Sequence, residues 1–218
     1  MLHPKIAFYL PLFLSSVVIL ISIWKWKKLD IPGKLVSIDQ SFSSLIGLIS
    51  YNYPVHNKVT FAILQGYNLI DFLLLCLFFN YSISRFRKKN IAICIAIAGF
   101  IIWIACIFFF RNIRWASSSR FESFHSLSAI ILSLIAIYFM LMDFEWRVLF
   151  RNPIFWFTVS ILFIFSTTFI FTIMFEIIAR DQALFWKIEL YTMVITCLDY
   201  LILGFAFLLY PKKNSAIA

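Results

Sequence analysis

The chain has few charged side chains, and this scarcity excludes most water-soluble folds. Only 13% of its 218 residues are Asp, Glu, Lys or Arg, whereas 63% are hydrophobic and 27 are phenylalanine. Soluble domains carry about 25% charged residues. Because a water-soluble core cannot enclose so many apolar side chains, the surrounding solvent must be lipid. We therefore predict an all-α fold, a polytopic bundle of helices that cross a bilayer.

Glycine is also scarce, and the motifs that depend on it are missing. With five glycines in the chain, the sequence has no phosphate-binding glycine loop and no GxSxG motif; it also lacks HExxH. The four cysteines contain no CxxC pair and lie in apolar stretches, which argues against a disulfide or zinc framework. The three histidines lack ligand spacing. We therefore predict no catalytic residue, no metal and no cofactor.

The net charge of +9 would suggest nucleic acid binding in a soluble protein. Here the lysines and arginines lie in short runs between apolar segments, as do loop charges that set the orientation of a membrane protein. No nucleic acid partner is predicted; the expected partner of the apolar surface is the lipid bilayer.

Six apolar segments are long enough to cross a bilayer, which needs about 20 residues of helix. They are residues 6–24, 59–83, 91–110, 124–142, 154–175 and 188–210. The first segment lacks an A-x-A cleavage site and is followed directly by the basic sequence WKWKK. We therefore predict that it is a retained span rather than a signal peptide.

A seventh segment, residues 32–50, contains the serine-rich sequence SIDQSFSSLIGLIS. Its apolar residues follow helical spacing, and its serines and Gln40 run along another side. Pro32 stands near the first turn, where proline loses no hydrogen bond. The pattern fits a span whose polar side faces other helices, and it also fits a helix that lies in the membrane interface.

The distribution of basic residues favours the spanning alternative. If residues 32–50 cross the membrane, 12 lysines and arginines lie on one side and 7 on the other; if they do not, the split is 9 to 10. Cytoplasmic loops carry an excess of Lys and Arg. We therefore predict one domain over residues 1–218 with seven spans, the N-terminus outside and the C-terminus inside. Six spans remain if residues 32–50 are interfacial.

Polar residues at the middle of the predicted spans form the candidate site. Asp71 and Asp199 each stand at the middle of a span, and Asp39 lies near the centre of residues 32–50. A charged aspartate at this depth costs about 2.5–3.5 kcal/mol, so such residues face the bundle interior. We predict a buried polar site among the second, third and seventh helices, made of Asp39, Gln40, Gln65, Asn68, Asp71 and Asp199. It would hold a proton, a monovalent cation or a small ligand; alternatively, neutral acids and amides hold the helices together.

Glu122 and His125 stand at i and i+3 beside the start of the span 124–142. Because histidine titrates near neutral pH, they are a candidate pH-sensitive pair near the outer surface. The alternative is an interfacial histidine without a special role. An intramembrane aspartyl enzyme would need two acids that face each other, which Asp71 and Asp199 provide only if the third and seventh helices touch at mid-depth.

Three stretches carry a resemblance to a known family. They are QGYNLIDFLLLCLFF (65–79), SAIILSLIAIYFMLM (128–142) and NPIFWFTVSILFIFSTTFIF (152–171). They resemble a family of small, roughly seven-span bacterial membrane proteins that is abundant in the Bacteroidota and mostly uncharacterised. The resemblance implies an inner-membrane location and a role in signalling or sensing, and it implies no known chemistry.

Three functions are compatible with these patterns. The leading prediction is a receptor or sensor that binds a ligand or ion in the polar site. Because its predicted cytoplasmic loops are short, it would act through another membrane or cytoplasmic protein. The second is an accessory subunit of a larger membrane complex, in which the aspartates are structural. The third is a small transporter or an intramembrane enzyme, although the sequence shows neither the inverted repeats nor the broken helices of secondary transporters.

Overall fold

The computed structural model describes residues 4–52, 58–110, 114–178 and 182–210, and within these ranges the chain is helical with no β-strand. The long helices are α1 (Pro4–Lys25), α2 (Ile31–Asn52), α3 (Lys58–Ser82), α5 (Ile91–Phe110), α6 (Arg114–Asp143), α8 (Pro153–Ile178) and α9 (Gln182–Leu209). The short helices η1 (Trp26–Lys28), α4 (Ser84–Lys89) and α7 (Trp146–Leu149) lie in the connections.

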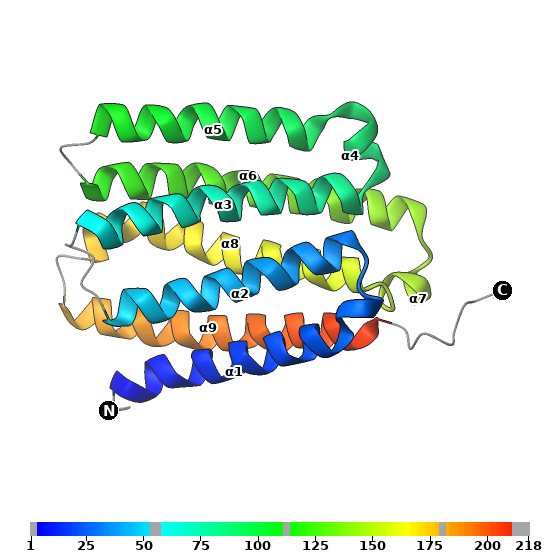
Figure 1. Cartoon of the computed structure of the whole chain (residues 1–218), viewed down its shortest axis with the longest axis horizontal. Coiled ribbons are helices and arrows are strands. Elements are labelled where there is room, and N and C mark those ends of the chain that lie inside the picture. Colours follow the sequence, from blue (N-terminus) through cyan, green and yellow to red (C-terminus); the bar gives the residue numbers. More distant parts are fainter. Residues whose placement is uncertain (1–3, 53–57, 111–113, 179–181, 211–218) are drawn as a thin grey trace.

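The long helices lie side by side with their axes roughly aligned (Figure 1). The short helices η1, α4 and α7 gather at the end where α9 also finishes. We call this the basic end, since it carries Lys25, Lys27, Lys28, Lys34, Arg85, Arg87, Lys88, Lys89, Arg147 and Arg151. At the same end Asn90 adopts a left-handed conformation (φ 53°) and closes α4 by donating its N–H to the carbonyls of Phe86 and Arg87.

Six helices are long and apolar enough to cross a membrane, namely α1, α3, α5, α6, α8 and α9. Together they indicate a multi-pass membrane protein. Their outward surfaces are apolar, as at Phe108 and Phe109, whose exposed fractions are 73% and 83%. Serines and other polar side chains are buried inside the bundle instead. This is the distribution that a lipid solvent favours.

Helix α2 is not among these six helices, yet it lies within the bundle, aligned with α1 and α3 (Figure 1). Its exposed face carries Phe42, Leu45 and Leu48, while Ser37 is buried. The prediction that residues 32–50 form a helix whose polar side faces other helices agrees with this placement.

Serine hydroxyls hold α2 against α1. The hydroxyl oxygens of Ser22 and Ser37 are 2.7 Å apart, and Ser15 and Ser44 form a second such contact. In each helix the two serines are seven residues apart, so they share one face of two antiparallel helices. Small side chains allow a close approach of the two backbones, and the hydroxyls satisfy one another where water is absent.

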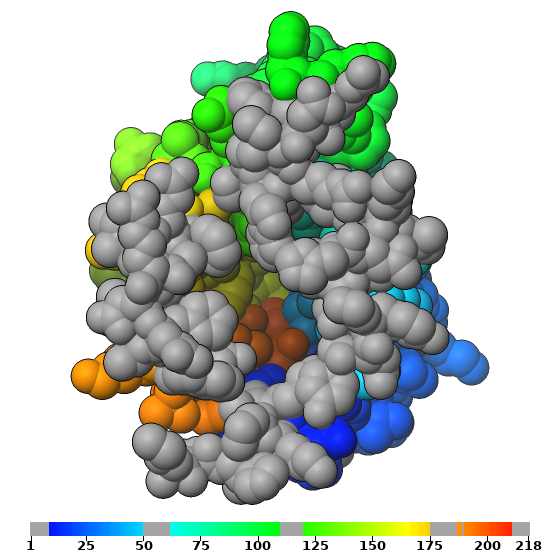
Figure 2. Space-filling view, turned by 90° about the vertical axis from the view of Figure 1, so that its left-hand side faces the viewer, coloured from blue at the N-terminus to red at the C-terminus, as the bar shows by residue number. Residues whose placement is uncertain are grey.

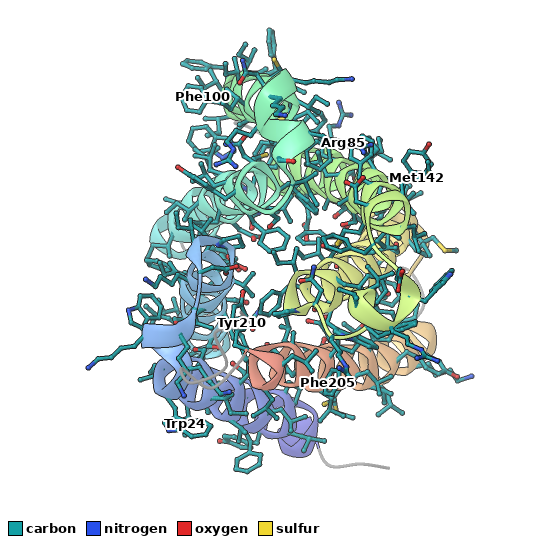
Figure 3. The ribbon with its side chains drawn as sticks, turned by 90° about the vertical axis from the view of Figure 1, so that its right-hand side faces the viewer. Trp24, Arg85, Phe100, Met142, Phe205 and Tyr210 are labelled. Atoms are coloured by element: carbon teal, nitrogen blue, oxygen red, sulfur yellow. The ribbon has the colours of Figure 1, made fainter. Side chains whose placement is uncertain are left out.

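The helices form a ring, with α2, α3, α6, α8 and α9 around the centre of the bundle. Helix α1 packs against both α2 and α9, and α5 packs against α3 and α6 from outside. Figure 3, a view from the basic end, shows this ring, with Trp24, Phe100 and Met142 pointing outwards. Side chains from these five helices therefore meet at the centre of the ring.

Aromatic side chains fill the half of the ring nearer the basic end. Phe78 from α3 contacts Phe157 from α8 at a ring-centroid distance of 6.3 Å. Phe157 in turn contacts Phe207 at 4.9 Å and Tyr210 at 6.2 Å. All four side chains are buried. These edge-to-face and tilted contacts form a continuous aromatic cluster from the middle of the bundle to its basic end.

Polar contacts lock the chain at the basic end. Lys25 donates to the carbonyl oxygens of Tyr210 (2.8 Å) and Leu208 (3.3 Å), which completes the C-terminus of α9. The hydroxyl of Tyr210 donates to Asp30 Oδ1 (2.6 Å), which also caps α2 by accepting from the N–H of Gly33 (2.9 Å). Burial, and then the hydrogen bond with Asp30, raise the pKa of Tyr210 above its ordinary value. We call this set of contacts the basic-end lock.

Two predicted helix starts are wrong, while the others lie within a few residues of the observed ones. Helix α6 begins at Arg114 rather than near residue 124, and α9 begins at Gln182 rather than near residue 188. In both cases the sequence analysis located the apolar span, but the helix continues into polar residues beyond it. A polar flank can remain helical where the bilayer core has ended, because water can solvate its side chains.

Gly99 on α5 lies against Phe72 on α3. A methyl group at residue 99 would stand 2.0 Å from the Phe72 ring, which is fully buried. We expect Gly99→Ala to reduce the stability by about 1–3 kcal/mol, because the ring must move within a packed interior. The measurement is the thermal unfolding midpoint of the purified protein in detergent. Gly47→Ala is the control, since nothing lies within 4 Å of the added methyl group; an equal loss in both variants would contradict the prediction.

The hydroxyl of Tyr210 offers a second test of the fold. We expect Tyr210→Phe to destabilise the protein by about 1.5–3 kcal/mol, because it removes a hydrogen bond to a carboxylate. Tyr138→Phe is the matched control, since Tyr138 is 57% exposed. Thermal unfolding in detergent measures both variants. Equal midpoints for Tyr210→Phe and the unmodified protein would show that the basic-end lock does not depend on this hydrogen bond.

Candidate functional site

Polar side chains from five helices point toward the centre of the ring. On α3, Tyr67, Asn68 and Asp71 share a face, and on α9 Asp199 and Tyr200 do so. The polar contributions from α2, α6 and α8 are Asp39, Gln40, Ser43, Glu122, His125, Ser160 and Thr168. These side chains line a cavity of about 340 Å³. We call it the central cavity.

Most of the predicted polar site lies in the central cavity. The residues of that prediction that line it are Asp39, Gln40, Asn68, Asp71 and Asp199. Gln65 does not line the cavity. It is buried nearby on α3, and its backbone carbonyl oxygen accepts a hydrogen bond of 3.1 Å from Trp103 Nε1 on α5. That bond also explains why a tryptophan lies in the middle of a span instead of at an interface.

The placement predicted for Glu122 and His125 near the outer surface is wrong. Because α6 begins at Arg114, His125 lies about three turns into the helix. Its exposed fraction is 3%, and it lines the central cavity together with Glu122. His125 Nδ1 is 3.9 Å from Asp71 Oδ2, too far for a hydrogen bond. The two residues therefore belong to the polar site of the cavity.

The carboxyl groups of the cavity interact with one another. Asp39 and Asp71 lie within hydrogen-bonding range, and Glu122 lies close enough to Asp71 for their charges to interact. At that distance a negative charge on one carboxyl group disfavours ionisation of the other. On the α8–α9 side, Ser160 donates a hydrogen bond to Asp199. The acids thus line two sides of the cavity, one on α2 and α3 and the other on α9.

Three buried atoms of the cavity residues lack a hydrogen-bond partner. They are Asp39 Oδ1, Gln40 Oε1 and His125 Nε2. A buried polar atom without a partner costs about 1–3 kcal/mol. Such atoms need a ligand or ordered water, because the protein itself supplies no partner for them. They distinguish this site from the serine contacts of α1 and α2, where each hydroxyl has a partner.

The central cavity has a polar half and an apolar half. Toward the basic end its lining is apolar, with Leu35, Val36, Leu74, Leu75, Phe78 and Leu203. The acids, amides and tyrosines lie farther from that end. On the opposite face of the molecule, Figure 2 shows a hollow near the centre, with atoms of α9 visible at depth. The polar half thus lies nearer the hollowed face than the apolar half does.

Ser160 on α8 and the two tyrosines, Tyr67 and Tyr200, were not predicted from the sequence, whereas Thr168 on α8 was expected to supply a hydroxyl group and does line the cavity. Ser160 was not identified because hydroxyl groups in a span usually bond to their own helix, as Thr168 does with the carbonyl of Ile164 (3.0 Å). Tyr67 directly precedes Asn68 on α3, and Tyr200 directly follows Asp199 on α9. Their adjacency to Asn68 and Asp199 is the one signal that could have identified them.

Among the described residues, no group of three or more His, Cys, Asp and Glu side chains could hold a metal ion. Asp71 and Asp199 line the same cavity, but the acid in hydrogen-bonding range of Asp71 is Asp39.

Comparisons of the chain with protein-family models, with curated proteins and with solved structures found no match. The resemblance to a bacterial seven-span family stays a prediction.

His125 provides a test of the unpartnered atoms. Its ring contacts Phe165 and Phe72 at centroid distances of 4.7 and 5.3 Å. We expect His125→Phe to raise the thermal unfolding midpoint by several degrees, since it keeps aromatic packing and removes a nitrogen that costs about 1–3 kcal/mol to bury unpaired. His125→Ala should lower the midpoint, because it also removes the packing. A lower midpoint for His125→Phe would mean that the nitrogen is bound in the native protein.

Proposed function

We propose that this chain is a seven-span protein of the bacterial inner membrane, of receptor or sensor type. It binds a small polar ligand or cation in the central cavity and acts through a partner protein at its basic end. The observation that carries this proposal is the set of polar side chains from five helices that line one cavity, three of which have a buried polar atom without a partner. Such atoms also occur outside the cavity, for example at Asn80 and Ser126, so it is their gathering with four carboxyl groups around one space that supports a ligand site.

The placement of α2 supports seven spans. An interfacial helix lies in the plane of the membrane, at a steep angle to the spanning helices. Helix α2 instead runs alongside α1 and α3 over the full height of the bundle (Figure 1). Its exposed side carries Phe42, Leu45 and Leu48 together with Ser41, whereas Ser37 is buried and Asp39 lines the cavity. We infer that α2 crosses the bilayer and hides its polar side within the ring.

The basic end supports an N-outside, C-inside orientation. Ten lysines and arginines of the described chain cluster there, and over the full sequence a seven-span topology places 12 on this side and 7 on the other. An excess of basic residues is typical of the cytoplasmic side. The inner membrane enters the proposal through the resemblance to bacterial seven-span proteins.

The shape of the cavity favours a receptor over a transporter. The aromatic cluster and the basic-end lock lie between the cavity and the basic end, whereas the opposite face is hollowed (Figure 2). A transporter must expose its site to both sides in turn. The aromatic cluster also gives a route for a signal, because Phe78 lines the cavity and Tyr210 holds the chain at the basic end.

Access to the cavity from each side of the membrane tests this proposal. The experiment uses Thr196→Cys, which places a thiol in the lining, in a background without the native Cys76, Cys94, Cys106 and Cys197. Membrane-impermeant thiol reagents are added to cells or to inverted vesicles, and the labelled fraction is measured. We expect labelling from the outer side only.

The same experiment separates the three functions. Labelling from both sides would favour a transporter, and labelling from neither side would favour a structural subunit with a closed interior. Leu198→Cys on the exposed face of α9 is the matched control, because its side chain is 46% exposed outside the cavity. Equal labelling of Thr196→Cys and Leu198→Cys would mean that the reagent reaches α9 without entering the cavity.

A further inference from the structure

We propose that the ligand of the central cavity is a small organic ammonium ion. Its N–H groups donate to Asp39 and Gln40 of α2, with Asp71 beside them, and its apolar body packs toward Phe78 and Leu203. The inference rests on the proposed function, because it assumes that the cavity is a ligand site. It adds the chemical class of the ligand and the way in which the ligand is oriented.

The carboxyl groups of the lining favour a cation as the ligand. Four carboxyl groups line the cavity, from Asp39, Asp71, Glu122 and Asp199, and none of its described lining residues is a lysine or arginine. Burial favours the neutral form of an acid, whereas a cation beside a carboxyl group favours its ionised form. An uncompensated charge is costly in a buried site, and a bound cation compensates it. An anionic ligand would find no lysine or arginine among the described lining residues to compensate its charge.

The unpartnered atoms favour a ligand that donates hydrogen bonds. Asp39 Oδ1 and Gln40 Oε1 are acceptors without a donor, and both line the cavity from adjacent positions of α2. An ammonium group carries several N–H donors and no acceptor, so one group can satisfy both oxygens. Bonds between a charged donor and a carboxylate are also stronger than neutral ones. A ligand with acceptors alone would leave both oxygens without a donor.

His125 adds a third unpartnered atom inside the site. It is 3% exposed, its Nε2 has no partner, and it lines the cavity. The charged and titratable groups nearest to it come from α3 and α6, namely Asp71 and Glu122. A neutral imidazole can accept a further N–H through one ring nitrogen. The histidine therefore completes the acceptor set without requiring a positive charge beside the ligand.

Size and shape favour an organic ion over an inorganic one. A cavity of about 340 Å³ lies within the range of small-molecule sites, which is about 300–1,000 Å³. No group of three His, Cys, Asp or Glu side chains in the described chain could hold a metal ion. The half toward the basic end is lined by leucines, a valine and Phe78. A bare cation would leave that half without a partner, whereas an ammonium ion with an apolar body fills both halves.

A matched pair of probes tests the proposal. The full-length protein in mild detergent is titrated with 2-phenylethylammonium chloride and, separately, with 2-phenylethanol, which has a similar shape without the charge. Binding is measured by calorimetry and by the thermal unfolding midpoint, at constant ionic strength. We expect the ammonium ion to bind saturably and at least tenfold more tightly than the alcohol. Sodium chloride at the same ionic strength should not raise the midpoint.

Substitutions locate the bound cation. Asp39→Asn should weaken binding of 2-phenylethylammonium at least tenfold, because it removes the charged acceptor while keeping the shape of the side chain. Gln40→Leu should weaken it severalfold, and it serves as a second variant if Asp39→Asn does not fold. Asp143→Asn is the control: it removes an exposed carboxylate, paired with Arg85 at 2.6 Å, far from the cavity. Its affinity should equal that of the unmodified protein.

Distinct results would overturn the inference and the proposed function. Equal affinities for the ammonium ion and the alcohol, or an unchanged affinity in both Asp39→Asn and Gln40→Leu, would overturn the ammonium site. If reagents still reach Thr196→Cys from outside, the cavity would remain a receptor site for another ligand. Absence of both probe binding and reagent access would remove the proposed function as well.

Discussion

A polar side chain inside a lipid-dissolved bundle can bond only with protein, with trapped water or with a ligand, and this constraint organises the whole molecule. It explains why large apolar side chains such as Phe108 and Phe109 face outwards while several serines are buried. It also separates two kinds of polar contact. The serines of α1 and α2 are satisfied in pairs and hold two helices together. The acids and amides of the central cavity are only partly satisfied, and they make the centre of the ring a binding site.

The fold was largely predictable because hydrophobic length and helical periodicity act locally. The apolar segments and the amphipathic pattern of residues 32–50 identified every long helix of the described chain. The depth of a residue within its helix was harder to predict from the sequence. His125 lies well inside α6 because the helix extends into a polar flank, and no apolar pattern marks that extension. The start of a span and the start of a helix are set by different forces, which are burial in lipid and backbone hydrogen bonding.

The candidate site was predictable as a set of residues, and much less as an arrangement. A carboxyl group at the middle of an apolar helix is costly enough to stand out in sequence, so Asp39, Asp71 and Asp199 were identified. Which helices surround them depends on ring closure, with α1 bridging α9 and α2. Sequence periodicity gives the inner face of each helix but not the order of the helices. For that reason the sequence could not show that Gln65 lies outside the cavity lining or that Ser160 lies within it.

Gly33 and Tyr210 behave as a single unit although 177 positions separate them. A methyl group at residue 33 would stand 2.6 Å from the Tyr210 hydroxyl oxygen. The tyrosine could then no longer reach Asp30 without shifting. Among descendants of this sequence, loss of the glycine should become tolerable only after a smaller side chain has replaced the tyrosine. The two positions should therefore covary among related sequences, because they contact each other in the folded protein.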